Sequence, residues 1–200
     1  MLSKFEEAYY TPTISALIEN QQIEHSLARI HSHRHISRCL IYAEKYLKDF
    51  LPSKHQNFDV YFAISFHDIG RVMELEDHSF VGSIEIANKC MSDLQLSDVL
   101  INDTCRLIQN KDKSYCNDVY EMIVHDVDCL DIMRPSTGRG GIIGFDRNYL
   151  QLFKNNPSKQ QEYIEFANKL IFLSENILYE SKNSLRLMME NMNDIWSNEL

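Results

Sequence analysis

Hydrophobic residues recur along the chain at helical spacing, and no segment shows the strict alternation and hairpin turns of paired strands. The clearest stripe follows His35 at i, i+4, i+7 and i+11, and it consists of Ile36, Leu40, Ala43 and Leu47. This spacing places apolar side chains on one face of an α-helix. Pro52 and Ser53 then supply a stop signal. We therefore predict an amphipathic helix that includes residues 33–47.

Two more helices are predicted before residue 95. The apolar segment 58–69 precedes Gly70, which suits a C-terminal helix cap. The next stripe consists of Phe80, Ile84, Ala87 and Met91. Its spacing also predicts one buried helical face.

The second half of the chain carries helix-start signals. Ser97 is a candidate N-cap for a helix whose inner face is Ile101, Cys105 and Ile108. Asp118, with Glu121 three residues later, resembles a capping box. Asn156 and Pro157 are a cap and a first-turn residue for a helix over 157–180.

The predicted fold class is all-α, a helical bundle with additional C-terminal helices. We expect a single domain over 1–200, with a core at about 25–150 and a helical extension at about 151–200. A last helix over 183–196 carries its own apolar stripe. The extension is expected to add a packing layer to the core, and a homodimer surface is the alternative role.

The net charge of −9 limits the kinds of partner that the protein is expected to bind. An acidic chain disfavours nonspecific binding to nucleic acid or to an anionic membrane. No apolar run approaches the ~18 residues of a membrane helix. The start of the sequence has no apolar signal region. The five cysteines are odd in number and form no C-x-x-C pair, so free thiols and a cytoplasmic location are expected.

The most informative chemical feature is the doublet His67-Asp68, which ends an apolar stretch in FAISFHDIGR (62–71). Burying an unpaired carboxylate costs several kcal/mol or more. A bound divalent cation removes that cost, because imidazole nitrogen and carboxylate oxygen are both metal ligands. His35 before the doublet and Asp126 after it are the further candidates.

Asp126 is selected on the last predicted helix by its neighbours. It lies one turn from Ile123 and Leu130 and therefore shares their buried face. The alternative for Asp126 is a buried carboxylate bound by backbone donors or paired with an arginine. Asp128 and Asp131 are expected to point elsewhere, as solvated or structural acids.

The order His…His-Asp…Asp on helices resembles the HD-domain superfamily of metal-dependent phosphohydrolases. The segments 33–47, 76–90 and 126–134 are similar to that family's first ligand helix, its next helix and its D-x-D-x-L-D ending. The similarity spans roughly residues 25–150. The resemblance implies one divalent transition metal ion (Mn, Fe, Co or Ni), with these ligands: His35, His67, Asp68 and Asp126.

Four histidines crowd the first predicted helix, and two of them, His31 and His35, are i, i+4 neighbours that could chelate a metal together. The resemblance selects His35, because Arg38 follows it as an arginine follows the family's ligand. His31 and His33 are expected to be exposed or to lie outside the ligand set.

The resemblance implies hydrolysis of a small, nucleotide-like phosphomonoester or phosphodiester by a metal-bound hydroxide. Asp68 is expected to bind the metal and orient the water, with Arg71 as a second catalytic residue. Arg71, His78 and Arg134 are the expected substrate contacts, and Arg139 ranks below them.

The sequence departs from several branches of the family. One branch of the family carries a glutamate four residues after the doublet's histidine. This chain has Arg71 at that position, so the general acid of that branch is not carried over. The family's two-metal branches add two histidines between the doublet and the last aspartate. Here only His78 and His125 lie in that interval, and His125 directly adjoins Asp126, which favours one metal over two. A catalytically silent HD fold that binds a nucleotide or a regulatory partner is the alternative function. An all-α interaction protein with structural histidines and aspartates is a third.

Overall fold

The computed structural model describes residues 33–51, 57–72, 80–113, 115–116, 118–132 and 150–175. Within these ranges the regular structure is entirely helical, which confirms the all-α prediction. The elements, in chain order, are α3 (His33–Phe50), α4 (Phe58–Phe66), the 3₁₀ helix η2 (Ile69–Val72), α5 (Phe80–Asp93), α6 (Asp98–Asn110), α7 (Val119–Ile132) and α8 (Pro157–Glu175).

Two predicted helix starts are confirmed by their caps. The Ser97 side chain accepts a hydrogen bond from the backbone N–H of Leu100 at 3.4 Å, one turn into α6. The Asn156 side chain accepts one from the backbone N–H of Lys159 at 3.3 Å, at the start of α8. Each cap satisfies a donor that the first turn of a helix leaves without a partner.

The capping box predicted at Asp118 forms only in part. Asp118 accepts a hydrogen bond from the backbone N–H of Tyr120 at 2.8 Å. Glu121 instead accepts hydrogen bonds from the side chains of Arg106, at 2.8 Å, and Asn110. Glu121 therefore links α7 to α6 rather than closing the first turn of α7.

Gly70 does not cap α4, contrary to the sequence prediction. α4 ends at Phe66, and the chain continues through His67 in a right-handed helical conformation into η2, which contains Gly70. A Cβ atom built on Gly82 of α5 would lie 3.3 Å from the Cα atom of Gly70. The pair therefore serves the close approach of α5 to η2.

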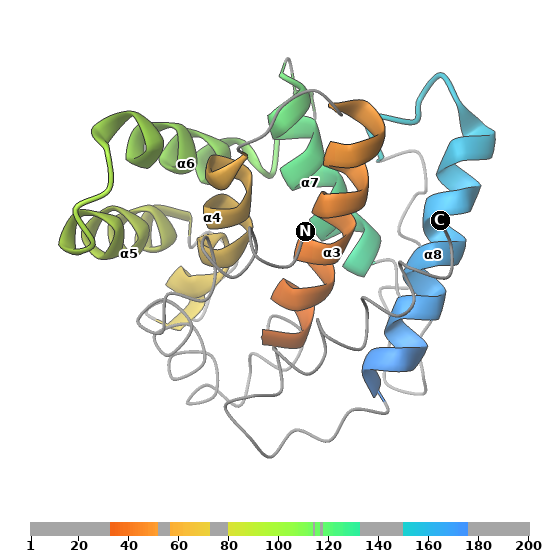
Figure 1. Ribbon diagram of the computed structural model, residues 1–200, viewed down its shortest axis with the longest axis horizontal. Helices are drawn as coiled ribbons and strands as arrows, with labels where there is room; N and C mark the ends of the chain where they lie inside the picture. The colour runs from red at the N-terminus through yellow and green to blue at the C-terminus, as the bar shows by residue number, and fades with distance from the viewer. Residues whose placement is uncertain are drawn as a thin grey trace.

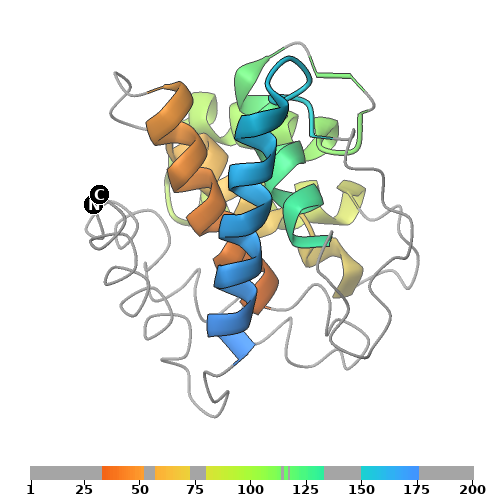
Figure 2. The same cartoon turned by 90° about the vertical axis from the view of Figure 1, so that its right-hand side faces the viewer.

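The helices form a layered bundle around α3 and α7 (Figure 1). α3 and α7 lie side by side, and α4 packs against both. α5 and α6 form a helical hairpin beyond α4, whereas α8 covers α3 and α7 from the opposite side (Figure 2). α8 is thus a packing layer on the core, as predicted. The predicted helix over 183–196 lies outside the described residues.

The predicted stripe of α3 is buried in the core. An aromatic cluster joins α3 to the start of α8, with ring centroids 4.4 Å apart for Tyr46 and Tyr163 and 5.4 Å apart for Tyr46 and Phe153. Burial of the Phe153 side chain stabilises the fold by roughly 1.5–3 kcal/mol. In the described part of the chain, none of the helices combines the length and the apolar character needed to cross a bilayer.

Candidate metal centre

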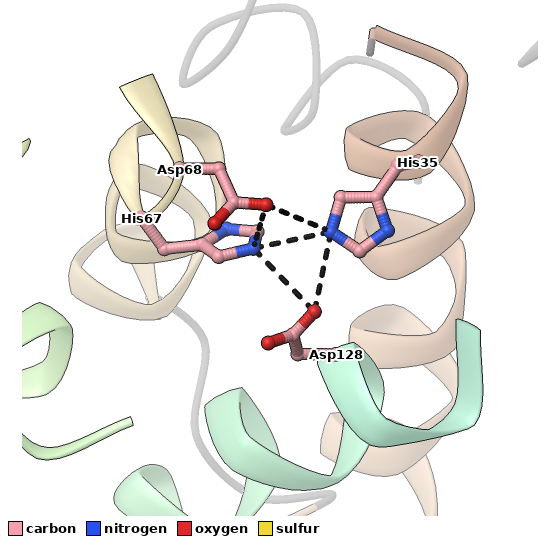
Figure 3. A group of neighbouring side chains, drawn as sticks. All are labelled: His35, His67, Asp68 and Asp128. Atoms are coloured by element: carbon pink, nitrogen blue, oxygen red, sulfur yellow. Dashed lines mark hydrogen bonds and ion pairs between the residues drawn. The ribbon is translucent and has the colours of Figure 1, made fainter. Parts of the chain in front are cut away.

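Four side chains from three segments converge in the core between α3, α4 and α7 (Figure 3). His35 comes from α3, His67 and Asp68 from the turn after α4, and Asp128 from α7. Each offers one ligand atom, and the four atoms lie within 4.8 Å of one another. We refer to these four residues as the ligand group.

The two imidazoles face each other through their Nε2 atoms, which are 3.1 Å apart. The Asp68 Oδ2 atom lies 3.4 Å from Nε2 of His35 and 3.1 Å from Nε2 of His67. The Asp128 Oδ1 atom lies 3.3 Å from Nε2 of His35 and 3.7 Å from Nε2 of His67. Two nitrogens and two oxygens therefore surround one point.

Hydrogen bonds on the far side of each ring set this orientation. The Nδ1 atom of His67 donates to the backbone carbonyl of Ile64 at 2.6 Å, since a carbonyl oxygen can only accept. The Nδ1 atom of His35 donates to Asp131 Oδ2 at 2.8 Å. With Nδ1 protonated, each neutral ring presents the lone pair of Nε2 to the centre, as metal-binding histidines do.

Asp131 is itself held by a buried arginine. Arg38 donates to the two oxygens of Asp131, at 2.5 Å from Nε and 2.8 Å from its terminal nitrogen. Burial opposes the charge on Asp131, but the Arg38 guanidinium, with help from His35, holds the pKa of this carboxyl well below its usual range. Arg38 and Asp131 thus form a charged pair that fixes the His35 ring. Arg38, which the sequence had already singled out, therefore does not belong to the ligand group but acts on it through Asp131.

The turn that carries the doublet is fastened to α5. The Ser83 hydroxyl donates to the backbone carbonyl of His67 and accepts from the backbone N–H of Gly70, both at 2.9 Å. These bonds replace helix bonds that are lost where α4 ends. Ser83 therefore positions His67 and Asp68 without touching the centre of the group, and no sequence signal had marked it.

The charges in the group are unbalanced without a cation. Burial alone would lower the pKa of His67, but Asp68 and Asp128 outweigh it and raise that pKa to about 9. Burial would likewise raise the pKa of Asp128, but Lys111 and the two histidines keep it well below its usual value. The group therefore holds two carboxylates that require positive charge, from protons or from a metal ion.

The Oδ1 atom of Asp128 shows the same need. It is buried and accepts no hydrogen bond within the described part of the chain, although Nε2 of His35 is close to it. A buried acceptor without a donor costs roughly 1–3 kcal/mol. Two imidazole nitrogens and two carboxylate oxygens suit a divalent first-row transition metal. The ligand group could therefore hold a metal ion, as predicted from sequence, with Asp128 in the place of Asp126.

Cys39 lies against the His35 ring but does not belong to the ligand group. Its Sγ atom lies 3.6 Å from Nδ1 of His35 and donates to the backbone carbonyl of Val127 at 3.5 Å. Burial raises the pKa of the Cys39 thiol to about 11, and the thiol donates to a backbone carbonyl instead of facing the centre of the group.

The structure brings together three of the four predicted ligands, His35, His67 and Asp68, but places Asp126 elsewhere. The Asp126 carboxylate accepts hydrogen bonds from the backbone N–H groups of Gln151, at 2.8 Å, and Leu152, at 3.0 Å. Nδ1 of His125 lies 2.9 Å from the same carboxylate. Asp126 is therefore a carboxylate bound by backbone donors, which was the alternative to a ligand role.

Asp128 takes the fourth position, which corrects the prediction that it would point away from the site. The physical reason is that residues 123–131 of α7 are all buried, because α3, α4, α6 and α8 surround this helix. A shared apolar face then carries no information about which aspartate meets the histidines. Asp131 is a structural acid, which is one of the two roles predicted for it.

Several predicted site residues lie where the structure gives no side-chain description. These are His31, His33, Arg71, His78, Arg134 and Arg139. Their proposed roles stay predictions.

The chain matches no protein-family model, no curated protein and no solved structure.

Proposed function

We propose that the protein is a metal-dependent phosphohydrolase of the HD type. One observation carries the proposal: two oriented imidazole nitrogens and two carboxylate oxygens, all buried, converge within 4.8 Å. The sequence motifs of the chain supply the reaction class, through their resemblance to the HD superfamily. The substrate class is a small, nucleotide-like phosphomonoester or phosphodiester.

His35, His67, Asp68 and Asp128 would hold one divalent ion, which would supply a Lewis acid and lower the pKa of a water bound to it. The ring orientations set by Asp131 and Ile64 leave both Nε2 atoms available for that ion. Asp68 lies beside both of these nitrogens, so it is placed to bind the ion and to orient the attacking water.

An anionic substrate needs positive charge beyond that of a metal ion, because the two ligand carboxylates already balance a divalent cation. Arg71, His78 and Arg134 are the proposed substrate contacts, with Arg71 also assisting the reaction. All five cysteines are free thiols, which suits the reducing cytoplasm proposed as the location.

The test is a turnover screen with the purified full chain, prepared without chelators and loaded with Mn²⁺, Co²⁺ or Ni²⁺. We expect hydrolysis of at least one member of a panel of phosphomonoesters and phosphodiesters. Removing the metal should abolish it, and Asp68→Ala should reduce kcat/KM by about 100-fold or more, since the residue serves both the metal and the water.

Asp93→Ala is the matched control, because it removes the same side chain from an exposed position on α5. It should keep wild-type turnover. Activity that is equal in the Asp68→Ala variant would contradict the proposal. Metal binding without turnover on any ester would favour the alternative of a silent nucleotide- or partner-binding protein.

A further inference from the structure

Lys111 is a buried cation next to the ligand group, and no sequence pattern had marked it. It directly follows α6, and its side chain is only 7% exposed. Its Nζ atom lies 3.5 Å from Oδ2 of Asp128 and 2.9 Å from Oδ1 of Asp112. Lysine is almost never buried unless it is paired, so this placement calls for a reason.

The two oxygens of Asp128 face different cations. Oδ1 points to the histidines, where a metal ion would bind, and Oδ2 points to Lys111. A lysine side chain is protonated at neutral pH by default, and the carboxylates of Asp112 and Asp128 beside Nζ favour that charged form. The ammonium is thus a resident positive charge on one side of the group.

We propose that Lys111 restricts this centre to a single divalent ion, by occupying the oxygen of Asp128 that faces away from the histidines and by placing its positive charge where a second ion would bind. The inference rests on the proposed function only in that the first ion occupies the ligand group. In two-metal hydrolytic sites the ions lie about 3.5–4 Å apart and share ligands. For Asp128 to bridge two ions through its two oxygens, Oδ2 must be available, and here Lys111 lies against it.

Charge acts in the same direction as geometry. One divalent ion balances Asp68 and Asp128, and Lys111 balances the neighbouring Asp112. A second divalent ion would then meet the charges of both the first ion and the ammonium, in a buried region where water screens them little. The Lys111 ammonium therefore takes the place of a second metal ion, and it belongs to the protein chain itself.

The surroundings of Nζ show how this restriction could be removed. The ammonium is lined by carboxylate oxygens of Asp112 and Asp128, which are ligands suited to Mn²⁺. Replacing Lys111 with glutamine removes the charge and adds an amide oxygen, on a side chain that is one bond shorter. Lys111→Gln should therefore create a second, weaker Mn²⁺ site beside the first.

The experiment counts Mn²⁺ ions per chain in the full-length protein, by mass spectrometry of the intact complex, and records their electron paramagnetic resonance spectra. Two ions at bridging distance are spin-coupled, whereas an ion at a distant surface site is not. Wild type should hold one uncoupled ion up to millimolar Mn²⁺. Lys111→Gln should hold two coupled ions, and Lys111→Arg, which keeps the charge, should hold one.

Lys113→Gln is the matched control, since it makes the same change at an exposed position two residues away. It should behave as wild type. A wild-type protein with two coupled ions, or a folded Lys111→Gln variant that never shows coupling, would overturn the proposal. No phosphoester is present in this test, so a failure of the hydrolase assignment, seen as absent turnover, would leave the ion count unaffected.

Discussion

Two aspartates two residues apart on α7 illustrate two ways to keep a carboxylate buried. Asp126 faces the start of the segment before α8, where backbone N–H groups of Gln151 and Leu152 bind both of its oxygens. Asp128 faces α3 and the turn after α4, where Oδ1 accepts no hydrogen bond in the described part of the chain. Both side chains are buried.

The difference between them separates structure from chemistry. Fixed N–H groups satisfy Asp126, so nothing further is needed at its site. Asp128 depends on cations, namely Lys111 on one oxygen and protons or a metal ion on the other. A carboxylate that no backbone N–H group satisfies is the one that remains available to bind a metal ion.

The largest expected effect concerns metal content. Asp128→Ala should lose the ion, with affinity reduced more than the 10–100-fold typical of a residue one step behind a ligand. Asp126→Ala should retain it. Metal per chain and the dissociation constant, from mass spectrometry and calorimetry, measure this difference. Loss of metal in the Asp126→Ala variant alone would reverse the assignment of the two aspartates.

The next effect concerns the pair behind His35. Asp131→Asn should weaken metal affinity about 10–100-fold, because the His35 ring loses its charged acceptor. It should also destabilise the fold by about 3 kcal/mol, because it leaves Arg38 buried without its partner.

The double variant Arg38→Met with Asp131→Asn separates these two consequences. It should recover much of the lost stability, since no buried charge is left without a partner. Its metal affinity should stay low, because the acceptor for His35 is still weakened. Recovery of both properties would show that ring orientation does not depend on the charge of Asp131.

Asp126 is expected to matter for stability alone. Asp126→Ala should lower the free energy of unfolding by about 2 kcal/mol, since two buried or half-buried N–H groups lose their acceptors. Asp126→Asn keeps one acceptor oxygen and should cost less. Chemical denaturation of the metal-free protein measures both, and a stability equal to wild type in Asp126→Ala would contradict the backbone-bound role.

Per pH unit, the smallest expected effect is a pH dependence confined to the ligand group. The pKa of His67 is raised from 6.5 to about 9, so protonation stabilises the metal-free fold below pH 6.5, and this contribution is lost as pH rises through about 9. A metal ion must displace that proton. Its affinity should therefore increase up to about pH 9, by roughly tenfold per pH unit for each proton released.

Calorimetric titrations between pH 6 and 9 test this dependence. Asp126→Ala should show the wild-type slope, because its carboxylate lies outside the group. A pH-independent affinity in the wild type would mean that the histidines are already deprotonated when the metal arrives.

The sequence alone predicted the helices well where a local signal existed. The stripe of α3, the Ser97 cap and the Asn156–Pro157 start depend on residues within one or two turns of one another, and each is confirmed. Gly70 shows the limit of such signals. A glycine after an apolar helix suits a cap, but here its backbone is approached closely by Gly82, which is distant in sequence.

The candidate site divides in the same way. His67 and Asp68 are adjacent in the chain, and the family resemblance selected His35 among the neighbouring histidines, so the sequence predicted that these residues meet in the core. Only the tertiary structure decided between Asp126 and Asp128, because α7 is buried on all sides and its rotation depends on the helices around it. The same holds for Lys111 and Ser83, whose roles arise from contacts 13 to 17 residues apart along the chain. Periodicity describes which face of a helix is apolar, but it cannot describe a helix that has no exposed face.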